Sequence, residues 1–419
     1  MSDELDQRPQ VPEPYAASAA ATPILILGID GGSMHHGALG IMRSAGQLGV
    51  AVFHAHAGGD TPISRSRYNA GRVRLPEDAT SAQRIDALLD FSRSHGRALL
   101  IPVDDVSAMF VEEHSEALRE AFLFQQQPAG LARSLASKRD MHELCLRHGV
   151  PTPLAMFPSS RADVAAHGAE ADFPVVLKRI DASLPCAPAA PSVAIAHSPQ
   201  ELLAAYALME SPQAPNVMLQ EYIPGSAESI WMLNGYFDAD SECPVAFTGQ
   251  KIRQAPPRTG ATTLGVCRSN PVVESTTRAF MKAVGYRGIL DLGYRYDARD
   301  GQYKLLDVNP RIGATFRLFV GPDGMDVLRA MYLDLTGQSV PGTSQTEGRR
   351  WLVEPLDLRT SLTLMREGEL TPGAWARSLR GVQETAWFSR DDYRPALATG
   401  AQLLRGRLRN LLRLRGTAA

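Results

Sequence analysis

The strongest constraint on the fold is a continuous apolar segment, "PILILGIDGG", which starts at Pro23 and ends in glycines. Apolar residues on both faces are typical of a buried strand in a parallel sheet, and the glycines fit the turn after it. A helical stretch, the strand "VAVFHAHAG", a helix near Ser81–Gly96 and the strand "ALLIPVDD" follow. This alternation of strands and helices predicts a doubly wound α/β domain over residues 23–125.

Composition narrows the class of protein. A chain of 419 residues can form two or three domains, and 44% hydrophobic with 21% charged residues is typical of a soluble globular protein. The net charge of -2 argues against bulk binding to nucleic acid. The four cysteines are scattered without metal-ligand spacing, which fits reduced thiols. We therefore expect a soluble, cytoplasmic protein with no nucleic-acid partner.

The two ends of the chain differ from its middle. Residues 1–22 are rich in Pro and Ala and lack the pattern of a signal peptide, so we expect a disordered tail. We expect a small helical appendage over 346–400. Residues 401–419 contain arginines but no acidic residue, with leucines along one stripe, which predicts a basic amphipathic helix. Two roles stay open for this helix: contact with the inner face of an anionic membrane, or packing on the protein itself.

A predicted β-hairpin, "RGILDLGYRYDARDGQYKLLDVNPR", carries the most polar strand end, with Gly301 at its turn. Asp291, Asp307 and Asn309 all have odd residue numbers. If the numbers of paired residues on the two strands add up to an even number (an even register sum), all three side chains lie on one face. Three close oxygen donors suit a hard cation, and Arg311 beyond them suits a negatively charged group. The alternative is a strand end whose polar residues enter a turn.

Four motifs occur in a fixed order: "ASKRDM", "PVVLKRI", "QEYIPGSAE" and "LLDVNPR". With them the chain resembles the ATP-grasp superfamily, and in particular its carboxylate–amine ligase branch, over about residues 23–341. The resemblance implies a fold of α/β and α+β class. A pre-ATP-grasp doubly wound domain would be followed by a two-lobed ATP-grasp domain over 126–345.

The resemblance also implies an ATP site with two lysines on the phosphates, a hinge that hydrogen-bonds adenine, and a carboxylate that accepts the ribose hydroxyls. In that order, these residues are Lys138 and Lys178, then Glu221, Tyr222 and Ile223, then Glu228. A physical reason supports Lys178, because an ammonium on an apolar strand is costly to bury without an anion. The alternatives are a snorkelling lysine at 178, a solvated helix lysine at 138 and a loop carboxylate at 228.

The same resemblance implies a metal site on the hairpin. Asp307 and Asn309 match the metal ligands of the family's acidic-x-Asn-Pro-Arg strand, although many relatives have Glu where this chain has Asp307. Asp291 is a further candidate ligand, and Gly293 competes for that alignment. Mg²⁺ fits because it binds through few carboxylates together with phosphate oxygens, and Mn²⁺ can replace it.

The activity that the resemblance implies is ATP-dependent, ADP-forming ligation of a carboxylate to an amine through an acyl phosphate. Arg311 would stabilise negative charge on the reacting group, and Lys178 would do so on the phosphates. Lys251, Arg253 and Arg258 form a basic cluster suited to a carboxylate substrate. An exposed basic strand is the alternative for that cluster.

Two other functions remain open at this point. One is a carboxylase-like enzyme that activates bicarbonate, and the other is a non-catalytic ATP-binding regulatory protein. A homodimer is a further expectation. The loop over residues 182–191 is rich in Pro and Ala and contains no glycine, unlike the flexible phosphate lid of many relatives, so a lid role is in doubt.

Overall fold

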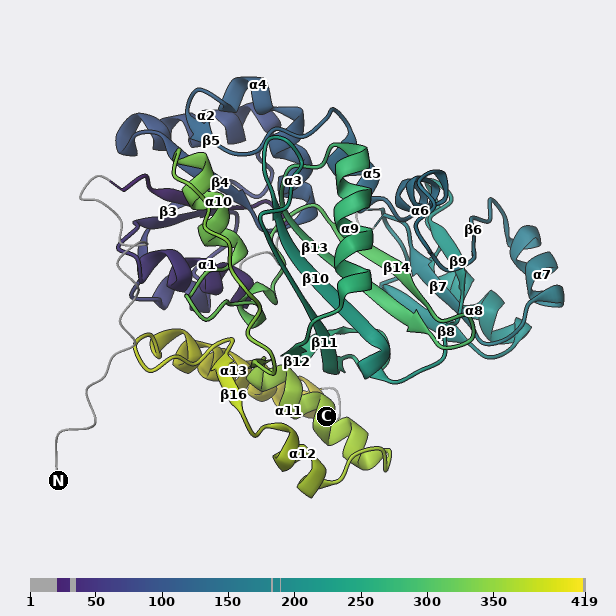
Figure 1. Ribbon diagram of the computed structural model, residues 1–419. Coiled ribbons are helices and arrows are strands. Elements are labelled where there is room, and N and C mark those ends of the chain that lie inside the picture. The colour runs from purple at the N-terminus through teal and green to yellow at the C-terminus, as the bar shows by residue number, and fades with distance from the viewer. Residues whose placement is uncertain (1–20, 31–34, 182–183, 189, 417–419) are drawn as a thin grey trace.

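The computed structural model describes residues 21–30, 35–181, 184–188 and 190–416, and of residues 407–416 it describes only the helical backbone. Within this part the chain forms three sheets of five, seven and four strands. In Figure 1 the five-stranded and four-stranded sheets lie on opposite sides of the seven-stranded sheet, and the C-terminal helices lie below. None of the described helices is long and apolar enough to cross a membrane.

The N-terminal sheet has the strand order β3-β2-β1-β4-β5, and all of its pairs are parallel. The first strand is buried at every residue, as its apolar sequence predicts. The doubly wound α/β domain is thus confirmed, and its order reverses between β1 and β4. Its elements are β1 (Ile24–Gly28), α1 (His36–Gly46), β2 (Val52–His56), η2 (Pro62–Arg65), β3 (Asn69–Arg74), α2 (Ser81–His95), β4 (Ala98–Pro102), α3 (Asp105–Glu113), α4 (Ser115–Leu118) and β5 (Phe122–Leu123).

The smaller antiparallel sheet has the order β6-β9-β7-β8 and packs against two helices over its own apolar core. Both helices start at a serine whose side chain accepts a hydrogen bond from the backbone N–H three residues on. This small lobe contains β6 (Ala155–Met156), α7 (Arg161–Glu170), β7 (Val175–Arg179), β8 (Val193–Ala196), α8 (Pro199–Met209) and β9 (Val217–Glu221).

The larger sheet has the order β14-β13-β10-β11-β12-β15-β16. Its strands pair antiparallel except for β15 and β16, which are parallel. Together the four-stranded and seven-stranded sheets confirm the predicted two-lobed architecture. Two short helices, α5 and α6, share a core with the larger sheet and α9. The elements of this lobe are α5 (Leu131–Ala136), α6 (Lys138–Arg147), η3 (Ala227–Ser229), β10 (Ile230–Phe237), β11 (Val245–Ala255), β12 (Ala261–Cys267), α9 (Pro271–Val284), β13 (Gly288–Asp297), β14 (Gln302–Asn309), η4 (Phe316–Leu318) and α10 (Val327–Leu335).

The predicted hairpin is formed by β13 and β14 with an even register sum at its open end. Asp291 pairs with Asn309, and Gly293 pairs with Asp307. A bulge shifts the register only beyond Gly293, towards the turn at Gly301. The three oxygen donors therefore lie on one face of the larger sheet.

The C-terminal region is helical as predicted, but two strands also join it to the larger sheet. Strand β15 (Arg350–Leu352) pairs with β12, and β16 (Val382–Thr385) pairs with β15. Three helices accompany them, α11 (Glu354–Arg366), α12 (Pro372–Ser378) and α13 (Arg394–Gly416). Since α13 begins at Arg394, the predicted boundary after residue 400 falls inside one helix, which corrects that boundary.

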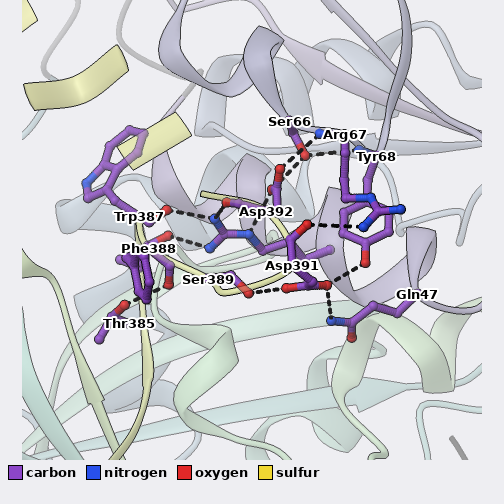
Figure 2. A network of polar contacts seen from close by, with 12 residues as sticks. Gln47, Ser66, Arg67, Tyr68, Thr385, Trp387, Phe388, Ser389, Asp391 and Asp392 are labelled. Atoms are coloured by element: carbon purple, nitrogen blue, oxygen red, sulfur yellow. Dashed lines mark hydrogen bonds and ion pairs between the residues drawn. The ribbon is translucent and has the colours of Figure 1, made fainter. Parts of the chain in front are cut away.

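Buried polar contacts also fix this region to the N-terminal domain. Arg43 of α1 donates to the backbone carbonyls of Trp387 and Asp392 and to the carboxylate of Asp392. Figure 2 shows this cluster of polar contacts, with Trp387, Asp391 and Asp392 beside Ser66 and Arg67. One apolar core continues from β1 and α1 through α10 to Trp351. The N-terminal domain, the larger sheet and the C-terminal strands therefore pack as one body.

Candidate active site

A cleft of about 460 Å³ separates the small lobe from the larger sheet. Both sheets and the connection after β9 contribute to its walls. The residues predicted from the sequence that line it are Lys138, Lys178, Glu221, Tyr222, Ile223, Lys251, Arg258, Asp291, Asp307, Asn309 and Arg311. Segments far apart in the chain, from α6 to the end of β14, thus converge on one cavity.

On the face of the larger sheet that carries Asp291, Asp307 and Asn309, some of the polar side chains already form hydrogen bonds with one another. Asn234 donates to Asp291 at 2.8 Å, and the amide of Asn309 donates to the other oxygen of Asp291 at 3.2 Å. Burial raises the pKa of Asp291, against the opposing effect of Arg311. A buried carboxylate of raised pKa gains from a cation in contact with it.

Lys138, the first residue of α6, forms an ion pair with Asp307 at 2.7 Å. The Asp307 carboxylate raises the pKa of Lys138, which outweighs burial. Burial alone would raise the pKa of Asp307, but Lys138, Lys178 and Arg311 together hold it below its usual value. The carboxylate is therefore ionised at neutral pH and available to a cation.

Two further lysines face the cleft without a carboxylate in contact. Burial, together with the charge of Lys138, lowers the pKa of Lys178 to about 8. Burial also lowers the pKa of Lys251 to about 8, and its ammonium donates to the backbone carbonyl of Gly260 at 2.9 Å and to the side chain of Gln254 at 3.3 Å. Ammonium groups in this state gain most from an anionic ligand.

Arg295 is a lining residue that the sequence reasoning missed. It is only 9% exposed, donates to the carbonyl of Gly225 at 2.6 Å and lies 5.9 Å from the ring of Tyr222. Burial lowers its pKa. Its position four residues after Asp291 on a strand was the available signal, because residues an even number apart tend to share a face.

The charges of the cleft fit a polyphosphate. Arg258 and Glu221 also line the cleft, but each is paired with charges outside the lining. The other charged lining residues are five cations and two carboxylates: Lys138, Lys178, Lys251, Arg295 and Arg311, with Asp291 and Asp307. The described residues contain no cluster of three or more His, Cys, Asp or Glu side chains placed to hold a metal. Two carboxylates with one amide fit Mg²⁺, which takes its remaining ligands from phosphate and water. The donor set therefore fits a magnesium ion that arrives with phosphates.

The hinge after β9 lines the cleft, but the carboxylate of Glu221 points to other partners. It accepts hydrogen bonds from the N–H of Leu154 at 2.9 Å, from Lys304 at 3.1 Å and from Arg299 at 2.7 Å. The backbone of this segment and the half-buried side chain of Tyr222 are left for a ligand, alongside the buried side chain of Ile223. Glu228 is exposed and does not line the cleft, so the structure does not bring it to the predicted ribose position.

Arg253 does not face the cleft, which corrects its assignment as a substrate residue. Its guanidinium makes a bidentate, buried ion pair with Asp357 of α11 at 2.8 and 3.0 Å. The bulge next to Arg253 in β11 turns its side chain towards the C-terminal helices. Arg258 belongs to the lining, but its guanidinium binds Glu367 and Glu369, so its charge is already paired.

Arg311 lies just beyond the end of β14 and is held from three directions. Its guanidinium donates to Asp105 at 2.9 Å, to the carbonyl of Ile312 at 3.3 Å and to Asn309 at 3.3 Å. Its side chain is 18% exposed. A fixed and permanently charged group thus stands beside the carboxylate face of the cleft.

Solved structures of other proteins have a similar fold. An L-amino acid ligase from Bacillus licheniformis superposes with a TM-score of 0.57 and 14% identity, over 78% of this chain and 75% of that one. A biotin carboxylase from Campylobacter jejuni gives a TM-score of 0.58 and 14% identity, over 79% and 75%. The chain therefore has the ATP-grasp fold.

Sequence comparison agrees with that fold. A D-aspartate ligase from Enterococcus faecium is 24% identical to this chain over 280 residues. The alignment covers 63% of this chain and 66% of the ligase, so the chain matches slightly less than two thirds of that relative's length. No family model matches the chain. The predicted lid loop falls partly outside the described residues, at 182, 183 and 189.

Proposed function

We propose that this protein is an ATP-dependent, ADP-forming ligase that joins a carboxylate to an amine through an acyl phosphate. The observation that carries the proposal is the cleft itself. Its excess of buried cations suits a polyphosphate, its carboxylate face suits Mg²⁺, and Arg311 stands where these two features meet. A binding protein would have no need for a fixed arginine beside the phosphate and metal positions.

In the proposed reaction the substrate carboxylate attacks the γ-phosphate of ATP, ADP leaves, and the amine then displaces phosphate. Lys138 and Lys178 would hold the phosphates, and the hinge backbone at Tyr222 and Ile223 would hold adenine. Arg311 would stabilise negative charge on the acyl group, with its permanent charge and planar donors. The lobes would exclude water from the cleft, which protects an acyl phosphate from hydrolysis.

Asp307, Asn309 and Asp291 would hold Mg²⁺. When bound, this ion would supply charge neutralisation and orientation at the phosphates. The ion pair between Lys138 and Asp307 supports the assignment, because an ammonium already rests on the carboxylate where a cation is expected. Mn²⁺ can replace Mg²⁺ at such oxygen ligands.

The names of the relatives suggest the substrate class. D-aspartate ligase and L-amino acid ligase both denote enzymes that activate an amino acid. We therefore propose an amino acid or similar small carboxylate as the acid. Lys251 is the lining cation that best supports this, since its ammonium contacts only neutral oxygens.

We also propose that the enzyme acts in the cytoplasm and contacts the inner face of the membrane through α13. Every described side chain from Ala401 to Gly406 is exposed, including Leu403 and Leu404. Exposed leucines together with arginines suit an anionic lipid surface. A homodimer remains a separate proposal, which light scattering on the purified protein would test.

The experiment that tests the ligase is ADP and phosphate release from Mg-ATP over a panel of amino acids, each with and without amine acceptors. Release that requires one acid and amine would support the ligase, and release with bicarbonate alone would favour a carboxylase. Arg311→Ala should keep ATP affinity within about threefold but reduce turnover by about 10²- to 10³-fold. Arg147→Ala, at the exposed end of α6, is the matched control and should change neither. ATP binding without release under any pairing would contradict the proposal.

A further inference from the structure

We infer that Asp105 of the N-terminal domain positions Arg311 for catalysis, so that the doubly wound domain supplies part of the catalytic centre. The inference rests on the proposed function for the role of Arg311. Asp105 is a positioning residue in this inference, because it acts through the guanidinium that it contacts. None of the site residues predicted from the sequence lies in the N-terminal domain.

Asp105 lies at the point where the strand order of the N-terminal sheet reverses, between β1 and β4. In open α/β sheets the carboxyl ends of the strands at this point form the usual binding crevice. The preceding residue, Asp104, closes the junction by accepting hydrogen bonds from the N–H of Ile29 at 3.0 Å and of Ser107 at 2.7 Å. Since Asp104 caps α3, Asp105 has no capping duty of its own.

The contacts of Arg311 show what Asp105 contributes. An arginine has five N–H groups, and three of these are committed to Asp105, Ile312 and Asn309. Asp105 takes the Nε hydrogen, and each terminal nitrogen keeps one N–H. These two remaining N–H groups can meet a carboxylate or an acyl phosphate oxygen. Without the contact at Nε, the guanidinium could rotate about the end of its side chain.

The environment of Asp105 argues against a purely structural duty. Its side chain is 41% exposed, whereas the buried ion pairs that hold the C-terminal region are almost wholly inaccessible. Within the described residues Arg311 is the side chain to which Asp105 is bonded. Its charge also contributes to the raised pKa of Lys138, after the larger effect of Asp307. Asp105 therefore lies beside the cleft, and its carboxylate interacts with Arg311 and Lys138, two charged groups of the cleft.

The test is a double-mutant cycle on kcat/KM for ADP release, with the acid and amine that the wild-type enzyme uses. Asp105→Ala should lower kcat/KM by about 50-fold, mostly in kcat, while ATP affinity stays within about twofold, because a misplaced group costs turnover. Asp105→Glu should recover part of this loss. In an Arg311→Ala background, Asp105→Ala should cost less than about threefold, since alanine leaves no guanidinium for Asp105 to hold. Glu113→Gln, at the exposed other end of α3, should leave kcat/KM unchanged.

Equal losses from Asp105→Ala in the two backgrounds would overturn the inference, because Asp105 would then act by itself. A second measurement does not depend on activity. Phenylglyoxal should modify Arg311 about threefold faster or more in Asp105→Ala than in the wild type, as read by peptide mass spectrometry, because the ion pair restrains the guanidinium. Unchanged labelling would also overturn it. If no acid supports ADP release, the proposed function fails, and the labelling result still decides whether Asp105 holds Arg311.

Discussion

Replacing Asp392 with alanine perturbs the cluster that fixes the C-terminal region to the N-terminal domain (Figure 2). The Asp392 side chain is 0% exposed and pairs with Arg43, whose side chain is 6% exposed. Its carboxylate accepts hydrogen bonds from Arg43 at 3.0 Å, from the hydroxyl of Ser66 at 2.8 Å and from the backbone N–H of Arg67 at 2.9 Å. The substitution removes both carboxylate oxygens and therefore all three hydrogen bonds at once.

Two separate estimates give a similar loss of stabilising free energy for Asp392→Ala. Breaking a buried ion pair by removal of one partner costs about 3–5 kcal/mol, because the other charge stays buried. Leaving three buried donors unsatisfied at roughly 1–3 kcal/mol each gives a range that overlaps it. Arg43 keeps its bonds to the carbonyls of Ala386 and Trp387, which favours the lower part of that range. We expect the C-terminal segment to open more easily by about 3–5 kcal/mol.

Hydrogen exchange followed by mass spectrometry measures this directly. Amides around β16 and the following loop should exchange about 10²- to 10⁴-fold faster in Asp392→Ala, since each 1.4 kcal/mol is a factor of ten. The control is Asp90→Ala, which breaks an exposed pair with Arg93 whose side chains are 69% and 67% accessible. That change should cost less than about 1 kcal/mol. Equal exchange rates in the two variants would refute the argument from burial.

Three further predictions concern the cleft and the tail. ATP affinity should fall by about tenfold between pH 7 and 9, because the pKa of Lys178 is about 8 and only its protonated form attracts phosphate. Equilibrium binding measures this dependence on pH, and Lys178→Arg should make it flat. A flat profile in the wild type would contradict this reasoning. Arg253→Met should destabilise the fold by about 3–5 kcal/mol in urea unfolding, whereas Lys251→Met should weaken substrate binding with little effect on stability. If Arg253→Met instead weakened substrate binding and Lys251→Met lowered stability, Arg253 would be a substrate residue after all. Removal of residues 401–419 should abolish sedimentation with anionic liposomes, and undiminished sedimentation would discard α13 as the membrane contact.

Local patterns predicted much of the fold and several cleft residues. The parallel sheet followed from apolar strands that alternate with helices, and the face shared by Asp291, Asp307 and Asn309 followed from strand parity. Both are properties of residues close in sequence, where the period of a strand or helix fixes direction. The predicted placements failed for Arg253 and Glu228, because a bulge and an exposed turn redirect side chains in ways that spacing does not show.

The sequence by itself thus determined the elements, the order of the motifs and the polar face of the hairpin. Only the tertiary structure decided which charges meet. Asp105 and Arg311 are 206 positions apart, and Arg43 and Asp392 are 349 apart, yet each pair is in contact. Such pairs depend on how the N-terminal sheet, the larger sheet and the C-terminal strands pack together. Periodicity carries no information about that packing, because it reports only the direction of a side chain within its own element.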